Sequence, residues 1–425
     1  TFMGHTGYVE SVSFSVDGCL VLSGSRDKTL KVWEVDITWR PTAAPFNVSR
    51  PKSSWEIVSD LEVYTHALSK AGMHFQLGQA VEAARHLRKA RSLPGYSHAL
   101  NALDLWRGLY GYLPRQSFLG AWEETTFEGH DDYVKSVCLS ANGQYALSGS
   151  DDKTLKLWEL KSGNCLRTLK GNKEIVEFVC LSEDGQYALS STSEDEINFK
   201  LWKLASGRCL HIFEGHTDYV NSISLSKDGC YVLTGSSDKT LKLWELASGS
   251  CVRTFEGHTG SVTSVCLSVD GCYALSASHD KTLKLWELAS GRCLRTFEGH
   301  TKFVAAVYAS LDGCYVISCS WDKTLKLWQV ADGHCLRTFE GHTDSINSVC
   351  LSADGRYAIS GSRDKTLKLW EVENGRCLRT FEGHKKSITS VCLSPDGRYA
   401  VSGSQDNTLK RWALDWELED REPAD

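Results

Sequence analysis

The sequence predicts an all-β fold, an eight-bladed β-propeller with an α-helical insertion in its first blade. Three observations carry this prediction. A Gly-His pair or its equivalent recurs eight times along the 425 residues, each copy shows the pattern of four short strands, and a segment with helical periodicity interrupts the first copy. A four-stranded sheet with two apolar faces cannot bury both of them alone, so the copies have to stack around a ring.

The repeats are recognised by their spacing. From the fifth copy onward each begins 42 residues after the one before it, the third copy is two residues longer, and the first copy holds 83 additional residues. The copies begin at Gly4, Gly129, Gly171, Gly215, Gly257, Gly299, Gly341 and Gly383.

Each strand can be located in one of the most regular units. Short apolar runs rich in β-branched and aromatic residues mark strands, and an Asp-Gly pair marks the tight turn between the first two. The fourth strand leads directly into the next Gly-His pair. In this unit the strands are Val262–Leu267, Tyr273–Leu275, Leu283–Trp286 and Cys293–Phe297, and the turn is Asp270-Gly271.

Gly-His near the start of each unit and Ser-Gly-Ser-x-Asp-Lys-Thr-Leu-Lys-Leu-Trp near its end resemble the WD-repeat family. The resemblance covers residues 1–35 and about 122–418, which we assign to the propeller. It implies an internal hydrogen-bond network of one His, one Ser or Thr, one Asp and one Trp in each repeat. Carried onto this chain, three such sets are His130, Ser148, Asp152 and Trp158; His216, Thr234, Asp238 and Trp244; and His258, Ser276, Asp280 and Trp286.

These His, Ser and Asp residues have the composition of a hydrolytic triad. They recur in seven of the eight repeats, however, and an enzyme has no use for seven copies. We therefore interpret them as buried, satisfied polar networks. The chain also lacks G-x-S-x-G, H-E-x-x-H and a phosphate-cradling loop. The sequence accordingly predicts no catalytic residue, no cofactor and no enzymatic activity.

Composition excludes further classes of function. A net charge of -6 and a pI near 6.2 speak against a general nucleic-acid-binding surface. No apolar run approaches the ~18 residues needed to span a membrane. The sixteen cysteines recur because the repeat recurs, and no Cys-x-x-Cys pair suggests a metal site. We expect free thiols in a reducing, cytoplasmic setting.

Residues 36–121 form the predicted helical insert, placed between the third strand of the first repeat and a fourth strand near Trp122–Phe127. Apolar residues at helical spacing predict two helices within Trp55–Arg91, joined at Leu77-Gly78, and a third from about Ser97 to Gly111. A hairpin docked on the propeller rim and a separate binding module are both compatible with this pattern. The helix pair resembles one tetratricopeptide unit, whose small and apolar positions match Ala71, Ala83, Leu87 and Ala90.

The ends of the chain leave the closure of the ring open. Either Thr1–Met3 or Leu414–Leu418 could supply the last strand of the eighth blade, and a seven-bladed ring with a displaced repeat is the lesser alternative. Residues 419–425 form a tail. Because Thr1 falls inside a repeat, we expect the chain to be cut from a longer protein.

Positions that vary between otherwise copied blades are free to carry binding specificity. The resemblance implies a binding face reached by three loop-edge positions per blade. In the sixth repeat these offer Phe303 and Trp321, flanked by His279 and Arg363, and exposed aromatics beside an Arg are typical of interface hot spots. The predicted face contains a second patch, formed by Tyr8, Arg26, Tyr133 and Lys135. Tyr219 is one further predicted residue of this face.

These features favour a non-enzymatic protein-interaction scaffold. Its resemblance to propellers attached to bacterial kinases and signalling NTPases implies the sensor or targeting part of a larger bacterial signalling protein. Two alternatives remain: a structural assembly platform acting through the helical insert, and a regulatory domain of a kinase or NTPase whose catalytic part is absent. The expected partner is a protein or peptide, or another domain of the same longer chain, and neither nucleic acid nor membrane.

Overall fold

A computed structural model describes most of the chain, in two compact units. The backbone is described for three strands between Val9 and Glu34, and then for residues 54–419 except 94–95, 98, 172–173 and 193–196; side chains are described from Val58 onward, without Leu100 and Gly111. One unit comprises residues 1–117 and 416–425, and the other comprises residues 118–415.

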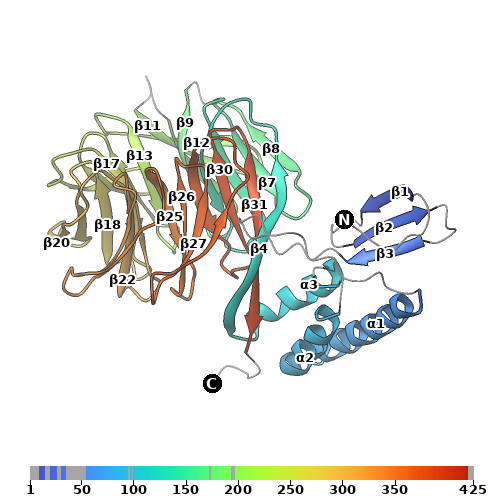
Figure 1. Cartoon of the computed structure of the whole chain (residues 1–425). Helices are drawn as coiled ribbons and strands as arrows, with labels where there is room; N and C mark the ends of the chain where they lie inside the picture. Colours follow the sequence, from blue (N-terminus) through green and yellow to red (C-terminus); the bar gives the residue numbers. More distant parts are fainter. Residues whose placement is uncertain are drawn as a thin grey trace. The chain divides into compact units, whose positions relative to one another are not determined.

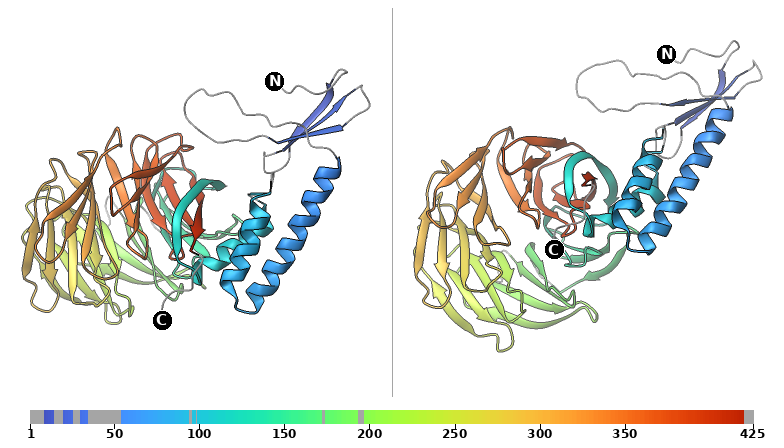
Figure 2. Two further views of the ribbon diagram at one scale, coloured as in Figure 1. Left: turned by 60° about the horizontal axis from the view of Figure 1, so that its bottom comes forward. Right: turned by 90° about the horizontal axis from the view of Figure 1, so that it is seen from below.

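The larger unit is a closed ring of seven antiparallel four-stranded sheets (Figure 1; Figure 2, right). The first strands of consecutive sheets contact one another around the ring, and β29 contacts β5, which closes it. The prediction of eight blades is therefore wrong. The ring has seven blades, the number in the lesser alternative given above.

Six blades consist of four strands consecutive in the sequence, and the seventh takes its outer strand from earlier in the chain. The first three blades are β5 (Val134–Leu139), β6 (Tyr145–Ser150), β7 (Leu155–Glu159) and β8 (Cys165–Leu169); β9 (Val176–Leu181), β10 (Tyr187–Thr192), β11 (Asn198–Lys203) and β12 (Arg208–Glu214); and β13 (Val220–Leu225), β14 (Tyr231–Ser236), β15 (Leu241–Glu245) and β16 (Cys251–Phe255). The others are β17 (Val262–Leu267), β18 (Tyr273–Ser278), β19 (Leu283–Glu287) and β20 (Cys293–Phe297); β21 (Val304–Ala309), β22 (Tyr315–Ser320), β23 (Leu325–Gln329) and β24 (Cys335–Phe339); β25 (Ile346–Leu351), β26 (Tyr357–Ser362), β27 (Leu367–Glu371) and β28 (Cys377–Phe381); and β29 (Ile388–Leu393), β30 (Tyr399–Ser404), β31 (Leu409–Leu418) and β4 (Arg115–Phe127).

The first repeat contributes no blade to this ring. Its strands β1 (Val9–Phe14), β2 (Leu20–Ser25) and β3 (Leu30–Glu34) form a separate three-stranded sheet. The predicted fourth strand, β4, lies beside β31 instead (Figure 1). Leu414–Leu418, considered above as a closing strand, continues β31, which is the third strand of its blade; Thr1–Met3 lies outside the described residues. The helices therefore precede the propeller in the chain and do not interrupt a blade.

Two ion pairs explain why β4 pairs with β31. Lys410 Nζ lies 2.5 Å from Glu123 Oε1, and Arg411 Nη2 lies 3.1 Å from Glu124 Oε2. The other fourth strands of the ring have Cys followed by Leu or Val at the positions of these two glutamates, and the other third strands have Leu at the position of Arg411. In β3 that position is Val32. Only β31 therefore supplies both cations that the carboxylates of β4 require.

Tryptophans at the ends of the third strands fill the layers between blades. Trp286 of β19, for example, packs with Leu241 and Phe255 of the preceding blade. Because two sheets share each such layer, every blade buries its apolar faces against both of its neighbours. The seven equivalent tryptophans are no more than 2% exposed: Trp158, Trp202, Trp244, Trp286, Trp328, Trp370 and Trp412.

Polar side chains also connect neighbouring blades. Ser222 Oγ accepts a hydrogen bond from the backbone N–H of Val265 in the next blade, at 3.1 Å. At the outer rim, the Arg253 guanidinium donates to the carbonyls of Ala289 and Ser290, at 2.9 and 3.0 Å. These bonds recur between several blade pairs, so the ring is fixed at both its inner and its outer strands.

The smaller unit contains the helices α1 (Ser54–Gln76), α2 (Ala80–Arg91) and α3 (Leu100–Gly108), followed by the 3-10 turn η1 (Leu109–Gly111). The structure thus has helices where the apolar periodicity predicts them. α1 and α2 lie side by side, and Gly78 between them has a φ of +74°, a conformation that glycine adopts readily (Figure 1). No helix among the described residues is long and apolar enough to cross a membrane.

The end of β31 completes the core of this helical unit. Leu418 is fully buried in the same cluster as Leu87 of α2 and Trp106 of α3. The Trp106 indole donates a hydrogen bond to the carbonyl of Trp416 at 2.9 Å, and Arg88 pairs with Glu417 at 2.5 Å. Residues widely separated in the sequence therefore form one hydrophobic core.

Candidate interaction face

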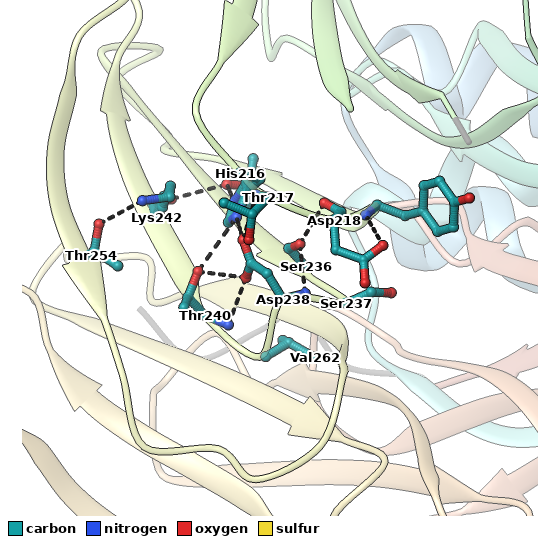
Figure 3. Close-up of polar contacts among 12 residues, drawn as sticks. His216, Thr217, Asp218, Ser236, Ser237, Asp238, Thr240, Lys242, Thr254 and Val262 are labelled. Atoms are coloured by element: carbon teal, nitrogen blue, oxygen red, sulfur yellow. Dashed lines mark hydrogen bonds and ion pairs between the residues drawn. The ribbon is translucent and has the colours of Figure 1, made fainter. Parts of the chain in front are cut away.

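The structure brings the predicted network residues together in six of the seven blades. In the β17–β20 blade, His258 Nδ1 lies 2.7 Å from Asp280 Oδ2, and its Nε2 lies 2.7 Å from Ser276 Oγ, which also accepts from the Trp286 indole at 2.8 Å. The predicted sets at His130 and His216 have the same geometry, and Figure 3 shows part of the second, with His216, Asp238 and Thr240.

These networks fix loops and leave no free nucleophile. The Ser276 hydroxyl is fully buried and already engaged by both the indole and the imidazole. Burial alone would raise the pKa of Asp280, but hydrogen bonds from His258 and Thr282 outweigh it and hold the pKa well below its ordinary value. The ionised carboxylate also accepts the backbone N–H of Thr259 at 3.0 Å, which ties together the two loops of this blade.

The residues that vary most lie on the loops that these networks hold. In the β21–β24 blade, the backbone N–H of Trp321 donates to the carbonyl of Phe303 at 3.0 Å. His279 and Ser261 form the same bond in the preceding blade, at 2.9 Å. The residue directly before the first Val or Ile of a blade and the residue directly before the turn Asp are therefore neighbours, and in the β21–β24 blade their side chains lie on the same face of the ring.

Four predicted residues form one cluster, which we call the aromatic cluster: His279, Phe303, Trp321 and Arg363. The His279 and Phe303 rings stack with centroids 4.4 Å apart, and those of Phe303 and Trp321 lie 5.4 Å apart. The Arg363 guanidinium lies 4.3 Å from the centroid of Trp321, within range of a cation–π interaction. Three consecutive blades contribute to this cluster.

Burial lowers the pKa of His279 below its ordinary value. At neutral pH its imidazole is therefore uncharged and stacks on Phe303 as an apolar ring. Phe303 remains 38% exposed. The cluster thus offers solvent a partly exposed aromatic surface, in which the Phe303 and Trp321 rings are tilted by 55°, with one cation at its edge.

The second predicted patch is arranged differently. Lys135 lies between two carboxylates, 3.5 Å from Asp151 and 3.6 Å from Glu177. The Lys386 ammonium lies 4.7 Å from the ring centroid of Tyr133. Tyr219 is 40% exposed and belongs to no cluster with these residues, and Tyr8 and Arg26 lie outside the described residues.

In several blades the loop-edge position directly after the first Val or Ile connects neighbouring blades. Asn221 donates to the carbonyl of Val262 at 2.8 Å, and Thr263 donates to that of Val304 at 2.6 Å. Asn and Thr are therefore two ways of making one inter-blade bond, whereas Lys135 at the same position forms ion pairs. Sequence reasoning missed Lys386, whose signal is the Lys385-Lys386 pair, which stands where four of the other repeats have Thr-Asp or Thr-Gly.

A cavity of about 510 Å³ lies at the turns between the first and second strands of the β9–β12 and β13–β16 blades. Its two aspartates are used within those turns: Asp184 accepts from Ser182, and Asp228 accepts from Ser226. None of the predicted site residues lines it. Among the described residues, no group of three or more His, Cys, Asp and Glu side chains could hold a metal ion, and every described cysteine is free.

Comparison with known proteins identifies the repeat. A family described as WD domain, G-beta repeat, matches residues 1–34, 122–159, 163–197, 207–245, 249–287, 291–329, 333–371 and 375–413. The chain belongs to the WD40 repeat family. All eight WD40 repeats are recognised, including the first, although only the last seven build the propeller.

Curated WD40 relatives share about one repeat with this chain. The ribosome biogenesis protein BOP1 homologues of Drosophila willistoni and Drosophila persimilis are each 51% identical over 48 residues, and that of Drosophila melanogaster is 48% identical over 48 residues. The match covers 11% of this chain and 6% of each relative. These relatives are fly proteins, so the expected bacterial signalling context gains no support from them.

Proposed function

We propose that this chain is a non-enzymatic scaffold that binds a protein or peptide at the aromatic cluster. One observation carries the proposal: within a frame of nearly identical blades, three adjacent blades bring together the rings of His279, Phe303 and Trp321, with Arg363 over Trp321. Aromatic residues with an adjacent Arg dominate the energetics of protein interfaces. Membership of the WD40 family supports the interaction role, and the single repeat shared with the fly proteins supports no more than that membership.

The networks beneath the face support the same proposal. They hold the loops of the cluster through backbone hydrogen bonds, such as that from Thr301 to Asp322 at 3.0 Å. A preorganised surface loses less conformational entropy when it binds. The aromatic cluster is therefore suited to bind a partner with little loss of its own conformational entropy.

Substitution of Trp321 by Ala tests the proposal. We expect partner capture from an extract of the source cell to fall at least tenfold, because truncating a central aromatic residue typically costs about 2 kcal/mol or more. The matched control is Gln405→Ala, at the equivalent turn position of the β29–β30–β31–β4 blade, which should capture the same partner as the unchanged chain. Equal capture by the two variants would contradict the proposal.

A further inference from the structure

We propose that the aromatic cluster receives an acidic segment of the partner, in which an apolar side chain is flanked by carboxylates. This inference rests on the proposed function and specifies the chemistry of the ligand.

Cations without carboxylate partners surround the cluster. Arg363, Lys302 and Lys323 are exposed, and none of them forms an ion pair with any residue that the structure describes. The Lys323 ammonium donates to the backbone carbonyl of Thr343, at 2.7 Å. Arg363 lies over Trp321, whereas Lys302 and Lys323 belong to the same two loops as Phe303 and Trp321.

Arg363 is placed to bind a carboxylate beside an apolar contact. The cation–π contact places the Arg363 guanidinium carbon 4.3 Å from the ring centroid of Trp321. An Arg held in this way keeps its N–H donors free for a bidentate pair with a carboxylate. An apolar side chain of the same ligand would cover the exposed edge of Phe303, which is 38% accessible.

The loops of the β5–β8 and β9–β12 blades have the opposite charge character. There Lys135 is held by Asp151 and Glu177, and Lys153 lies 3.6 Å from Glu174. Asp131 and Asp132 are exposed beside them. Near the cluster, the exposed Asp344 accepts the backbone N–H of Ser345 at 2.7 Å. The exposed carboxylates of the β5–β8 and β9–β12 loops therefore disfavour an acidic segment, apart from the position of Lys386 over Tyr133, whereas the cations of the cluster attract it.

Selection from a random peptide library displayed on phage tests the inference with the full chain. We expect the bound pool to be enriched in peptides with Asp or Glu within two or three positions of a large apolar residue. Enrichment should disappear with Trp321→Ala and persist with Gln405→Ala. The charge-reversed double variant Lys302→Glu/Arg363→Glu should instead select Lys and Arg.

A synthetic peptide from the wild-type pool gives the quantitative test. By fluorescence anisotropy we expect Arg363→Glu to weaken its binding at least tenfold and Gln405→Ala to leave it unchanged. Trp321-dependent enrichment of neutral apolar peptides would overturn the acidic ligand and leave the proposed function standing. Enrichment that does not depend on Trp321 would contradict the proposed function as well.

Discussion

Ser276 is the residue at which the polar network of its blade converges. Its hydroxyl accepts from the Trp286 indole and bonds His258 Nε2, and all three side chains are buried. Water cannot replace the hydroxyl at such a site without a cavity to hold it. A single atom therefore satisfies two polar groups, one from the third strand and one from the loop.

We predict that Ser276→Ala destabilises the propeller by about 2–4 kcal/mol, because two buried polar groups, the Trp286 indole N–H and His258 Nε2, lose their hydrogen-bond partner and each costs about 1–3 kcal/mol. The midpoint of urea unfolding, followed by tryptophan fluorescence, measures the effect. The matched control is Ser290→Ala in the same blade, whose exposed hydroxyl contacts only Glu287 and the local turn, and it should shift the midpoint little. An unchanged midpoint for Ser276→Ala would show that water enters the site.

For single residues, the sequence predicts which positions vary on the binding face, but it predicts only part of their contacts. Trp321 could be recognised from the sequence as a variable position, because the other repeats show which residue types stand at the same place. The stacking of His279 on Phe303 was not, since these residues belong to different repeats and only the ring brings them together. The separate environment of Lys135, between two carboxylates, also requires the fold.

Among the elements, β31 has the most unusual surroundings. Its beginning is a third strand of the propeller, whereas Leu418 at its end is fully buried with α2 and α3. Helical periodicity predicted α1 to α3, because such periodicity is a local property of the sequence. It could not predict that residues more than 300 positions later complete their core.

Truncation after Asp415 tests this role of β31. We expect the helices to lose protection, because the core loses Leu418, worth about 1.5–3 kcal/mol, and the buried Trp106 indole loses its acceptor. Hydrogen exchange measured by mass spectrometry should rise at least tenfold in peptides of α1, α2 and α3. Truncation after Glu419, which keeps these contacts, is the control. Equal exchange in both truncated chains would show that the helices form their core alone.

For the whole molecule, the number of blades is decided by one pairing. Eight repeats are present in the sequence, yet seven blades form because β4 joins β31. The repeat pattern is equally compatible with β4 pairing with β3, so counting repeats led to the wrong number. Glu123, Glu124 and Arg411 differ from the residues at the same positions of the other repeats. These differences indicate the pairing of β4 with β31 only once the residues are known to be neighbours.

A charge-swap experiment at Glu123 and Lys410 tests this closure. Glu123→Lys places two ammonium groups together where Lys410 is only 11% exposed, so we expect a clear loss of stability. The double variant Glu123→Lys/Lys410→Glu should recover part of it, with a coupling on the order of 0.5–3 kcal/mol. The free energy of unfolding in urea measures each variant. Strict additivity of the two single changes would mean that the pair does not select the closing strand.

The position of β4 in the chain has a consequence for biosynthesis. This strand leaves the ribosome before any blade of the ring, whereas its partner β31 is made after every other strand of the ring. Until β31 is made, β4 therefore remains an unpaired edge, and the sheets on either side of the future closure expose apolar faces. A nascent chain stalled before residue 409 would consequently be a client for chaperones, however complete its other blades are.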